Sequence, residues 1–331
     1  MRATYKKYTL NFITPGGTSR GILTSKNTYI LTVEEDERKG VGECALFEGL
    51  SCDDVPDYEE KLHWLATNIA LDPEQIYQYL ENYPSLWIGY EQAMANLNWG
   101  SDEYFPSAFS RGQDGIQING LVWMGNRTYM ERQIEEKLQN GFSCIKLKIG
   151  VDWQTEKQVI AMLRVRYPAS QLEIRVDANG AFNKNNVEQV LDELSSLDIH
   201  SIEQPIKPGQ SSLLYNLCRN TPVPIALDEE LIGNHSRKKE ILDIVPQYII
   251  LKPSLMGGFS GCDSWIDLAE KNKVGWWITS ALESNIGLNA IAQYTYTKAP
   301  KMPQGLGTGG VFSNNFPSSL TLKQDILKKK I

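Results

Sequence analysis

Residues 144–150 read Cys-Ile-Lys-Leu-Lys-Ile-Gly, an apolar run in which two lysines alternate with apolar neighbours. In a β-strand, alternate side chains point to the same face, so Lys146 and Lys148 point one way and Leu147 the other. An antiparallel strand with one solvated face would explain this pattern without any function. A parallel strand is covered on both faces, so two lysines there would require anionic partners or a chemical role.

Four further charged residues follow short apolar runs downstream of Lys148: Asp177, Glu203, Asp228 and Lys252. The successive steps along the chain are 29, 26, 25 and 24 residues. A strand, a crossover helix and two loops fit such a step, so the spacing predicts one charged residue in each β/α unit. In a closed parallel barrel the carboxyl ends of all strands meet at one mouth. The spacing therefore predicts a site with three carboxylates between two lysines.

The pattern around these residues alternates between strand and helix, which is typical of a parallel barrel. Strands are predicted at 116–122, 144–149, 172–176, 200–202, 223–227, 248–251, 274–278 and, weakly, near 305–306, with helices at 129–140, 153–166, 187–197, 211–219, 236–244, 258–272 and 284–296. An open doubly wound sheet is the structural alternative, but no G-x-G-x-x-G follows any predicted strand. We therefore expect an α/β fold with a TIM-type barrel at residues 114–311.

The first part of the chain has a different pattern. Residues 4–13, 21–33 and 40–45 are rich in strand-forming residues, and Gly21, Gly40 and Gly42 suggest the bends of an antiparallel meander. Helical periodicity follows at 53–70, 72–81 and 86–99. We expect an α+β domain at residues 1–105 and a boundary within 101–114, which lacks clear periodicity. The C-terminal segment 312–331 is a candidate addition to this domain, and its lysine run 328–330 is expected to be a solvated tail.

Composition excludes several classes of function. The net charge of −7 over 331 residues argues against binding to nucleic acid or to an anionic membrane. Five scattered cysteines without a C-x-x-C pair indicate neither a disulfide framework nor a zinc site. The N-terminus lacks the apolar region of a secretory signal, and no apolar stretch approaches the length of a membrane helix. We expect a cytoplasmic protein that binds a small-molecule carboxylate, with a homo-oligomer as a candidate assembly.

The three acids indicate a hard metal ion. Each acid alone is explained by a turn after a strand, but Asp177, Glu203 and Asp228 recur in the same position of successive units. Carboxylate ligands without histidine or cysteine favour Mg²⁺, with Mn²⁺ as a substitute. Glu229 and Glu230 are alternative candidates for the metal ligand. Asn179 and Glu229 are expected to orient the ligands through hydrogen bonds.

The two outer lysines are candidates for proton transfer. Lys148 and Lys252 fall on strands two and six of eight, roughly opposite each other across the mouth. Either lysine would serve as a base if its pKa fell from about 10.4 to about 7 or 8, which Lys146 and a metal ion would favour. The histidines at 63, 200 and 235 are assigned to packing or to solvent, and no nucleophile-elbow motif supports acyl transfer.

The motifs together resemble the enolase superfamily, specifically its muconate-lactonising subgroup. They are K-x-K at 146–148, D-x-N at 177–179, E-Q-P at 203–205, D-E at 228–229 and K-P-S-L-M-G-G at 252–258. The resemblance covers nearly the whole chain and implies a modified (β/α)7β barrel with an N-terminal α+β capping domain. Within the subgroup, segments 118–123, 251–258 and 280–288 look most like the o-succinylbenzoate synthase family.

The resemblance also implies a reaction and residue roles. The reaction is the metal-dependent dehydration of 2-succinyl-6-hydroxy-2,4-cyclohexadiene-1-carboxylate to 2-succinylbenzoate in menaquinone biosynthesis, catalysed by a carbon-oxygen lyase. Asp177, Glu203 and Asp228 would bind Mg²⁺, Lys148 would be the acid/base, Lys252 would face it as a cationic stabiliser, and Lys146 would tune Lys148. Arg20 and the 47–51 loop are candidates for closing over the substrate, and Ser280 and the 307–310 segment, which begins with Gly307, for shaping its succinyl end. Apart from the resemblance, the Gly257–Gly261 segment is expected to open a helix and is a candidate to aim N–H groups at a substrate anion.

Alternatives remain within and outside this family. Related dipeptide epimerases place an Asp-x-Asp where this chain has Gly307-Thr308-Gly309, so a substrate with a free amino group is disfavoured. A racemase of N-acylated amino acids uses the same metal and lysines and stays open. A catalytically silent barrel that only binds a ligand is the third possibility, and it predicts binding without exchange of the α-proton.

Overall fold

The N-terminal part of the chain forms an antiparallel sheet backed by helices in the computed structural model, which describes residues 1–18 and 21–331. Its elements are β1 (Arg2–Thr18), β2 (Gly21–Glu35), β3 (Arg38–Cys44), α1 (Tyr58–Thr67), α2 (Pro73–Leu80) and α3 (Pro84–Trp99). The strands follow the order β1-β2-β3, and both pairings are antiparallel. The predicted meander and helices are therefore confirmed, with strands longer than expected.

Two glycines in this sheet have a different role from the one predicted. Gly40 and Gly42 lie inside β3, and the turn before it falls at residues 36–37. A Cβ added at Gly40 would come 2.1 Å from the carbonyl oxygen of Ala93, and one at Gly42 would come 2.0 Å from that of Gly89. These glycines therefore allow β3 to pack closely against α3, and the prediction that they mark bends is wrong.

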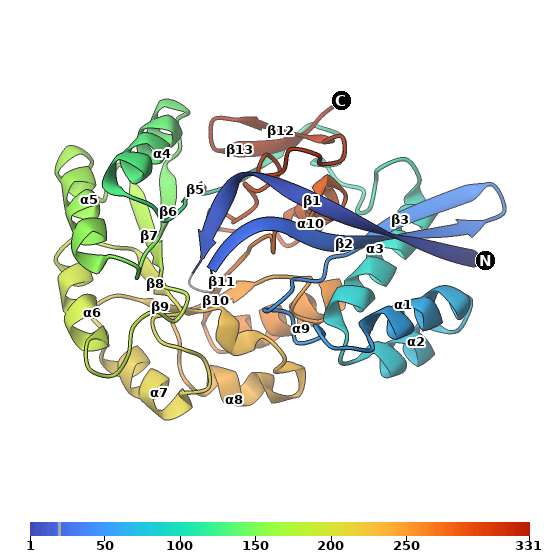
Figure 1. Cartoon of the computed structure of the whole chain (residues 1–331), viewed down its shortest axis with the longest axis horizontal. Helices are drawn as coiled ribbons and strands as arrows, with labels where there is room; N and C mark the ends of the chain where they lie inside the picture. The colour runs from blue at the N-terminus through green and yellow to red at the C-terminus, as the bar shows by residue number, and fades with distance from the viewer. Residues whose placement is uncertain (19–20) are drawn as a thin grey trace.

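The remainder of the chain alternates between parallel strands and outer helices (Figure 1). The strands are β5 (Gly120–Val122), β6 (Cys144–Lys148), β7 (Glu173–Asp177), β8 (Ser201–Glu203), β9 (Ile225–Leu227), β10 (Tyr248–Leu251) and β11 (Gly275–Ile278). The helices are α4 (Arg127–Gln139), α5 (Trp153–Arg166), α6 (Val187–Ser195), α7 (Ser211–Asn220), α8 (Lys238–Leu242), α9 (Gly258–Lys271) and α10 (Asn285–Thr297), with 3-10 turns η1 (Glu229–Leu231) and η2 (His235–Arg237). All pairs from β5 to β11 are parallel.

The edges of this sheet are joined by short bridges in place of a regular eighth strand. Thr279 bridges to Gly305, and Ile118 bridges to Gln304, both in parallel orientation. The chain at 304–305 thus lies between β11 and the start of β5, where the weak last strand is predicted. Apolar side chains from both the strands and the surrounding helices form a continuous buried cluster. This arrangement is a modified TIM barrel with an N-terminal capping part, as the sequence predicts.

The C-terminal segment forms a hairpin that is missing from the predictions. β12 (Leu320–Lys323) and β13 (Ile326–Lys329) pair with β4 (Gly115–Gln117), so the strand predicted at 116–122 is split into β4 and β5. Lys329 is only 8% exposed, and its Nζ lies 2.8 Å from Asp102 Oδ1. The prediction of a solvated tail is therefore wrong at Lys329, because Asp102 supplies a counter-ion. The domain limits at 105, 114 and 311 remain a prediction.

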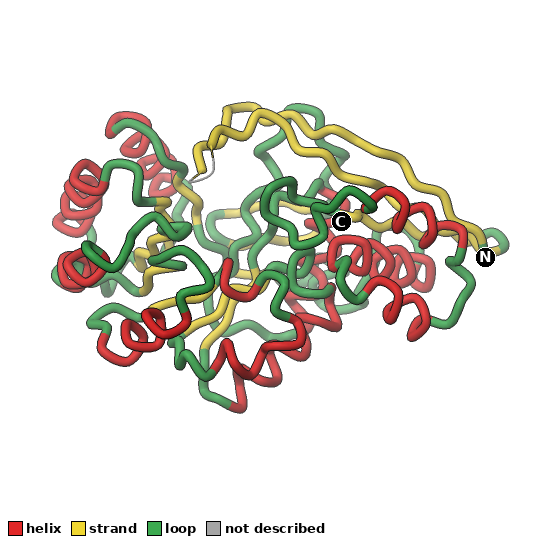
Figure 2. Tube along the Cα trace, turned by 60° about the horizontal axis from the view of Figure 1, so that its bottom comes forward, coloured by secondary structure: helices red, strands yellow, loops and turns green. Residues whose placement is uncertain are grey.

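The capping part reaches across the barrel mouth through the long β1–β2 hairpin, which the cartoon and the Cα tube both show crossing over the barrel (Figures 1 and 2). A buried cluster of Leu10, Leu282 and Phe312 joins the hairpin to the barrel. Two carboxylates of the capping part, the buried Glu43 and the partly buried Glu91, also reach helix N-termini of the barrel. Glu43 accepts hydrogen bonds from Ser284 and Gly287 at the start of α10, and Glu91 accepts them from residues 259 and 260 at the start of α9.

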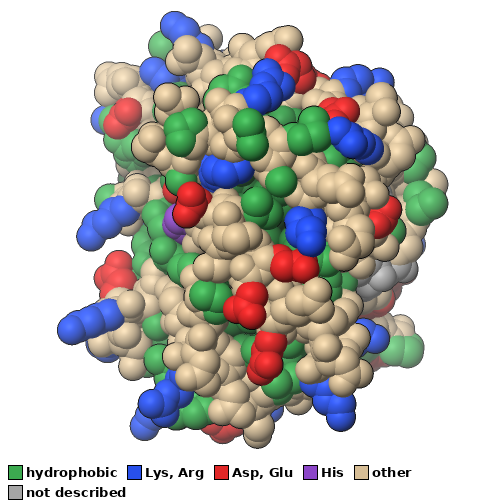
Figure 3. All heavy atoms as spheres, turned by 90° about the vertical axis from the view of Figure 1, so that its left-hand side faces the viewer, with side chains coloured by type: hydrophobic (Ala, Val, Ile, Leu, Met, Phe, Trp, Pro, Cys, Tyr) green, Lys and Arg blue, Asp and Glu red, His purple; other side chains and the backbone are tan. Residues whose placement is uncertain are grey.

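The outer face of the barrel shows how charge is distributed over its helices. On the face shown in Figure 3, basic and acidic side chains are interspersed along the outside of the barrel. Among the helices of the described residues, none combines the length and apolar character required to cross a membrane.

Candidate active site

The charged residues predicted from the 25-residue spacing lie at one end of the barrel. Lys148, Asp177 and Glu203 are the last residues of β6, β7 and β8, and they are paired in register across these strands. Asp228 and Lys252 directly follow β9 and β10. The parallel arrangement thus brings together groups that are far apart in sequence, as expected for the mouth of a barrel.

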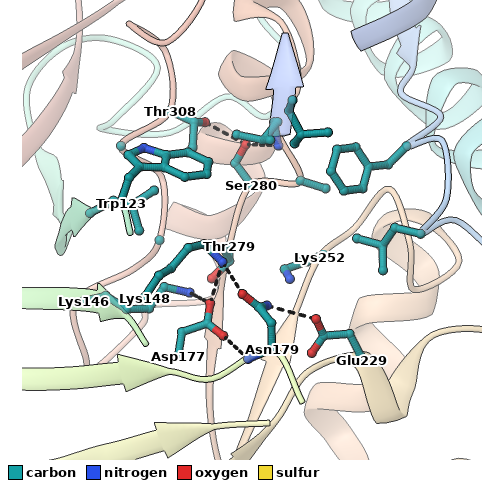
Figure 4. A pocket seen from close by; sticks show the side chains of 18 of the residues that line it. Trp123, Lys146, Lys148, Asp177, Asn179, Glu229, Lys252, Thr279, Ser280 and Thr308 are labelled. Atoms are coloured by element: carbon teal, nitrogen blue, oxygen red, sulfur yellow. Dashed lines mark hydrogen bonds and ion pairs between the residues drawn. The ribbon is translucent and has the colours of Figure 1, made fainter. Parts of the chain in front are cut away.

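The lysines and carboxylates form a connected network (Figure 4). Lys146 Nζ lies 3.2 Å from Asp177 Oδ2 and 2.9 Å from Glu203 Oε2. Lys148 Nζ lies 3.1 Å from the same Asp177 oxygen, and Lys252 is paired with Asp228. All of these side chains are buried except that of Lys148, which is partly exposed. Buried charges are stable only when paired in this way.

Neighbouring polar groups fix the orientation of Lys148. Asn179 Oδ1 accepts a hydrogen bond of 2.6 Å from Lys148 Nζ, and Asn179 Nδ2 donates one of 3.0 Å to Glu229 Oε1. The Asn179 backbone N–H also donates to Asp177 Oδ1 at 3.1 Å. Asn179 has a left-handed φ of 44°, an unusual conformation for a residue other than glycine and one found often at functional sites. The side chain of Asn179 therefore links the Lys148 ammonium to Glu229.

The three predicted metal ligands lie at the ends of the neighbouring strands β7, β8 and β9, but each forms an ion pair with a lysine. In residues 1–18 and 21–331, no three acidic, histidine or cysteine side chains are already gathered as a metal-binding group. However, Glu203 Oε1 and Asp228 Oδ1 are buried atoms that have no hydrogen-bond partner within the described part of the chain. Buried carboxylate oxygens without partners are costly, which suggests that a cation or water belongs beside them.

The pKa shifts of the three carboxylates also indicate that the neighbouring lysines do not fully compensate the burial of Glu203 and Asp228. Burial, together with the nearby Asp177 and Asp228 carboxylates, raises the pKa of Glu203 to about 7. Burial also raises the pKa of Asp228, although Lys252 opposes the shift. Burial acts against ionisation of Asp177 too, but Lys148 and Lys146 outweigh it and lower its pKa. The lysines therefore satisfy Asp177 better than they satisfy Glu203 and Asp228.

Two of the lysines are held in their charged form. Burial favours neutral Lys146, but the Glu203 and Asp177 carboxylates outweigh burial and raise its pKa. The same competition raises the pKa of Lys252, where Asp228 is the main opposing charge. The expected lowering of a lysine pKa is therefore not found for Lys252, because carboxylates surround it. Both side chains are suited to stabilise negative charge on a ligand.

A cavity of about 120 Å³ lies against these groups. Lys148 and Lys252 stand on either side of it, with Asp177, Asn179 and Glu229 along one wall (Figure 4). Glu203 and Asp228 are not among the residues that line it. The roof comes from the capping part and the late barrel loops, and it contains Leu23, Phe47, Leu50, Ser280, Leu282, Gly307 and Thr308.

The predicted substrate contacts are thus brought together only in part. Ser280 and Gly307 line the cavity, whereas Arg20 lies outside the described residues. Ser280 Oγ donates to Glu283 Oε2 at 2.5 Å and accepts hydrogen bonds from Thr308 Oγ1 and the Leu282 N–H. Because these bonds use the donor and both lone pairs of the hydroxyl, Ser280 shapes the cavity and has no further hydrogen bond to give.

One predicted anion site and several lining residues require revision. The N–H groups at the start of α9, after Gly257 and Gly258, donate to Glu91 of the capping part, so the prediction that they face a substrate anion is wrong. Sequence reasoning also missed the roles of Trp123 and Asn119, which line the cavity, whereas Thr308 lies within the predicted 307–310 segment. Trp123 directly follows β5, so the strand-end rule that located the charged residues would have located it too.

Comparison with known proteins identifies the family to which the chain is similar. Residues 129–308 match the enolase C-terminal domain-like family. The chain is 43% identical to o-succinylbenzoate synthase of Desulfotalea psychrophila, over 99% of this chain and 98% of that protein. The crystal structure of MenC from the same organism superposes with a TM-score of 0.87 at 41% identity and covers 99% of both chains. N-succinylamino acid racemase of Thermus thermophilus is 32% identical over 47% of this chain and 41% of that protein.

Proposed function

The chain belongs to the enolase superfamily and, within it, to the o-succinylbenzoate synthase family, and on this premise we propose that it catalyses the reaction of that family. The reaction dehydrates 2-succinyl-6-hydroxy-2,4-cyclohexadiene-1-carboxylate to 2-succinylbenzoate, a step of menaquinone biosynthesis. The observation that carries this proposal is the 43% identity over nearly the whole length of both proteins. The pair of lysines on opposite sides of one buried, carboxylate-lined cavity supports it (Figure 4).

Enzymes of this family depend on a divalent metal, and we propose Mg²⁺, with Mn²⁺ as a substitute. Asp177, Glu203 and Asp228 would hold the ion. The buried oxygens of Glu203 and Asp228 without partners in the described residues, and the raised pKa of Glu203, support this choice of ligands. When bound, the ion would stabilise the negative charge that develops on the substrate carboxylate during proton removal. Asn179 and Glu229 would support the ligands through their mutual hydrogen bond.

Lys148 is the proposed acid/base. Its Nζ is fixed between Asp177 and Asn179, and it borders the cavity. In its neutral form Lys148 takes the proton from the ring carbon next to the carboxylate. The ring C–O bond then breaks, and the leaving hydroxide takes that proton from Lys148 and departs as water. The proton thus returns to the leaving group, and the ring becomes aromatic without any net change at Lys148.

The remaining two lysines supply fixed positive charge to the site. Lys252, held in its charged form by Asp228, faces the opposite side of the substrate and stabilises negative charge as it forms. Lys146 sits between Asp177 and Glu203, so it holds two of the proposed ligands and adds positive charge beside Lys148.

A racemase of N-acylated amino acids is the second candidate, because the chain is also similar to an N-succinylamino acid racemase. Racemisation would use a lysine on each face of the α-carbon, and Lys148 and Lys252 occupy such positions (Figure 4). We also propose a cytoplasmic location, a small carboxylate substrate without nucleic-acid or membrane partners, and a homo-oligomeric state that native mass spectrometry would reveal.

One experiment separates the candidates. The purified protein with Mg²⁺ is given the cyclohexadiene substrate and, in parallel, N-succinyl amino acids in deuterated water. Formation of the aromatic product without deuterium uptake into the amino acids supports the synthase. Uptake without dehydration supports the racemase, and ligand binding without either reaction supports a silent barrel.

A further inference from the structure

Trp123 stands between the active-site cavity and a second cavity. The second cavity has a volume of about 470 Å³ and lies between the β1 strand and α4. Asn119, Leu121, Trp123 and Gly307 line both cavities. The two spaces are therefore separated by a wall that is one layer of residues thick, and Trp123 is the largest side chain in that wall.

Trp123 is held from both parts of the molecule. On the barrel side, Gln133 of α4 accepts a hydrogen bond from the backbone N–H of Trp123 and donates one to its backbone carbonyl, each at 3.0 Å, which fixes the main chain from which the indole projects. On the capping side, Gly16 of β1 packs so closely that an added Cβ would lie 3.2 Å from the indole Cζ3. Trp123 also packs against the buried cluster formed by Leu10, Leu282 and Phe312. The wall is thus a fixed feature of the site.

The position of the indole decides which part of a ligand it would meet. Lys148 Nζ lies 6.0 Å from the centroid of the indole ring. Asp177, Asn179 and Glu229 lie at the opposite side of the cavity from Trp123, Ser280 and Thr308 (Figure 4). On the proposed function, the ring carboxylate of the substrate points toward Asp177 and its reacting carbon lies beside Lys148. The acyl side chain must then extend toward Trp123 and Gly307.

We propose that Trp123 sets the length of acyl side chain that the site accepts, because its indole closes the way into the second cavity. A succinyl chain ends at the indole. A longer chain collides with it, although the second cavity behind would accommodate the extra carbons. The second cavity is bordered by Arg132, Glu136 and Lys137 of α4, and the Lys137 ammonium is paired with Glu136 at 3.4 Å. This inference rests on the proposed synthase function and adds a specificity-determining residue to it.

The test compares chain lengths in variants of one residue. Wild type, Trp123→Ala and Trp123→Phe are assayed on the succinyl substrate and on an analogue whose side chain has two more methylenes, an adipoyl chain. Trp99→Ala is the matched control, because Trp99 is 59% exposed at the end of α3. Affinities for the aromatic products, 2-succinylbenzoate and 2-adipoylbenzoate, are measured in parallel by calorimetry.

The ratio of kcat/KM for adipoyl over succinyl substrate should rise at least about tenfold in Trp123→Ala, the size of effect expected for pocket-size discrimination. Trp123→Phe should give a smaller rise and Trp99→Ala none, and the ratio of product affinities should follow the same order.

If Trp123→Ala does not fold, Trp123→Leu keeps an apolar side chain in the cluster and serves the same comparison. An unchanged ratio in variants that still react with the succinyl substrate overturns the inference alone. A wild-type protein that does not react with the succinyl substrate overturns the proposed function, and the inference with it.

Discussion

Glu43 offers a quantitative test of how the capping part is joined to the barrel. Glu43 Oε1 accepts hydrogen bonds from Thr28 Oγ1 at 2.8 Å and from the Ser284 N–H at 2.9 Å. Its Oε2 accepts from Ser284 Oγ at 2.6 Å and from the Gly287 N–H at 2.9 Å. The carboxylate is fully buried, and it also opposes the effect of burial on Lys26, whose pKa is lowered. Glu43 thus serves as the acceptor for the N-terminus of α10.

The substitution Glu43→Gln changes this network in a predictable way. Each carboxylate oxygen faces one hydroxyl and one backbone N–H, so the new amide NH₂ group must face a backbone N–H in either orientation. That buried donor loses its acceptor, which costs about 1 to 3 kcal/mol. The remaining hydrogen bonds lose their charge assistance, and Lys26 loses a neighbouring anion. We expect the free energy of unfolding to fall by about 2 to 3 kcal/mol, the upper part of the range for a buried donor that loses its acceptor.

Urea unfolding followed by circular dichroism measures this loss. Glu34→Gln is the matched control, because Glu34 lies on β2 in the same sheet and forms an exposed pair with Arg2 at 2.8 Å. The control should stay within about 0.5 kcal/mol of wild type. If Glu43→Gln also stays within about 1 kcal/mol of wild type, the buried network does not stabilise the fold and the reasoning from its geometry is wrong.

Further predictions concern the site and one buried acid. Lys148→Ala should lower kcat by a factor of about 10²–10⁴ or more while Mg²⁺ binding, measured by calorimetry, changes little; normal turnover would reject Lys148 as the base. Asp228→Ala should lose both Mg²⁺ binding and turnover, and retained Mg²⁺ affinity would remove Asp228 from the ligand set. A chelator should stop turnover and added Mg²⁺ should restore it; undiminished activity in the chelator would contradict the metal requirement. Burial raises the pKa of Asp53 to about 6 although Ser85 donates to it, so its contribution to stability is fully present below about pH 4 and is lost as the pH rises through about 6. Asp53→Asn should remove this pH dependence of unfolding, and an unchanged difference from wild type between pH 4 and 7 would contradict it.

The barrel was predictable because its information is local and repeated. Each unit carries a short apolar strand, a charged residue at its end and a periodic helix, so Lys148, Asp177 and Glu203 identify the mouth without knowledge of the contacts between strands. The same rule applies to Trp123, but an aromatic residue at a strand end is more often a packing residue than a functional one. Charged groups that need partners are therefore easier to identify from sequence than the apolar walls that shape a cavity.

What escaped prediction depends on contacts between distant segments. The strand predicted at 116–122 is divided because Gly115–Gln117 pairs with a hairpin about 210 residues later, and no local pattern reveals that partner. Lys329 is buried because Asp102 lies beside it. Gly40 and Gly42 resemble turn residues, and only the approach of α3 shows that they permit close packing. Arg20 falls outside the described residues, so its role remains a prediction.

The carboxylates of Glu43 and Glu91 have a consequence for how a ligand enters. Both belong to the capping part, and both accept backbone N–H groups at the beginnings of barrel helices. Swinging the capping part away as a rigid lid would break at once the hydrogen bonds that both carboxylates accept from these helix ends. We therefore expect the substrate to enter through rearrangement of the short Phe47–Ser51 segment, which lines the cavity, and not through a hinge between the two parts.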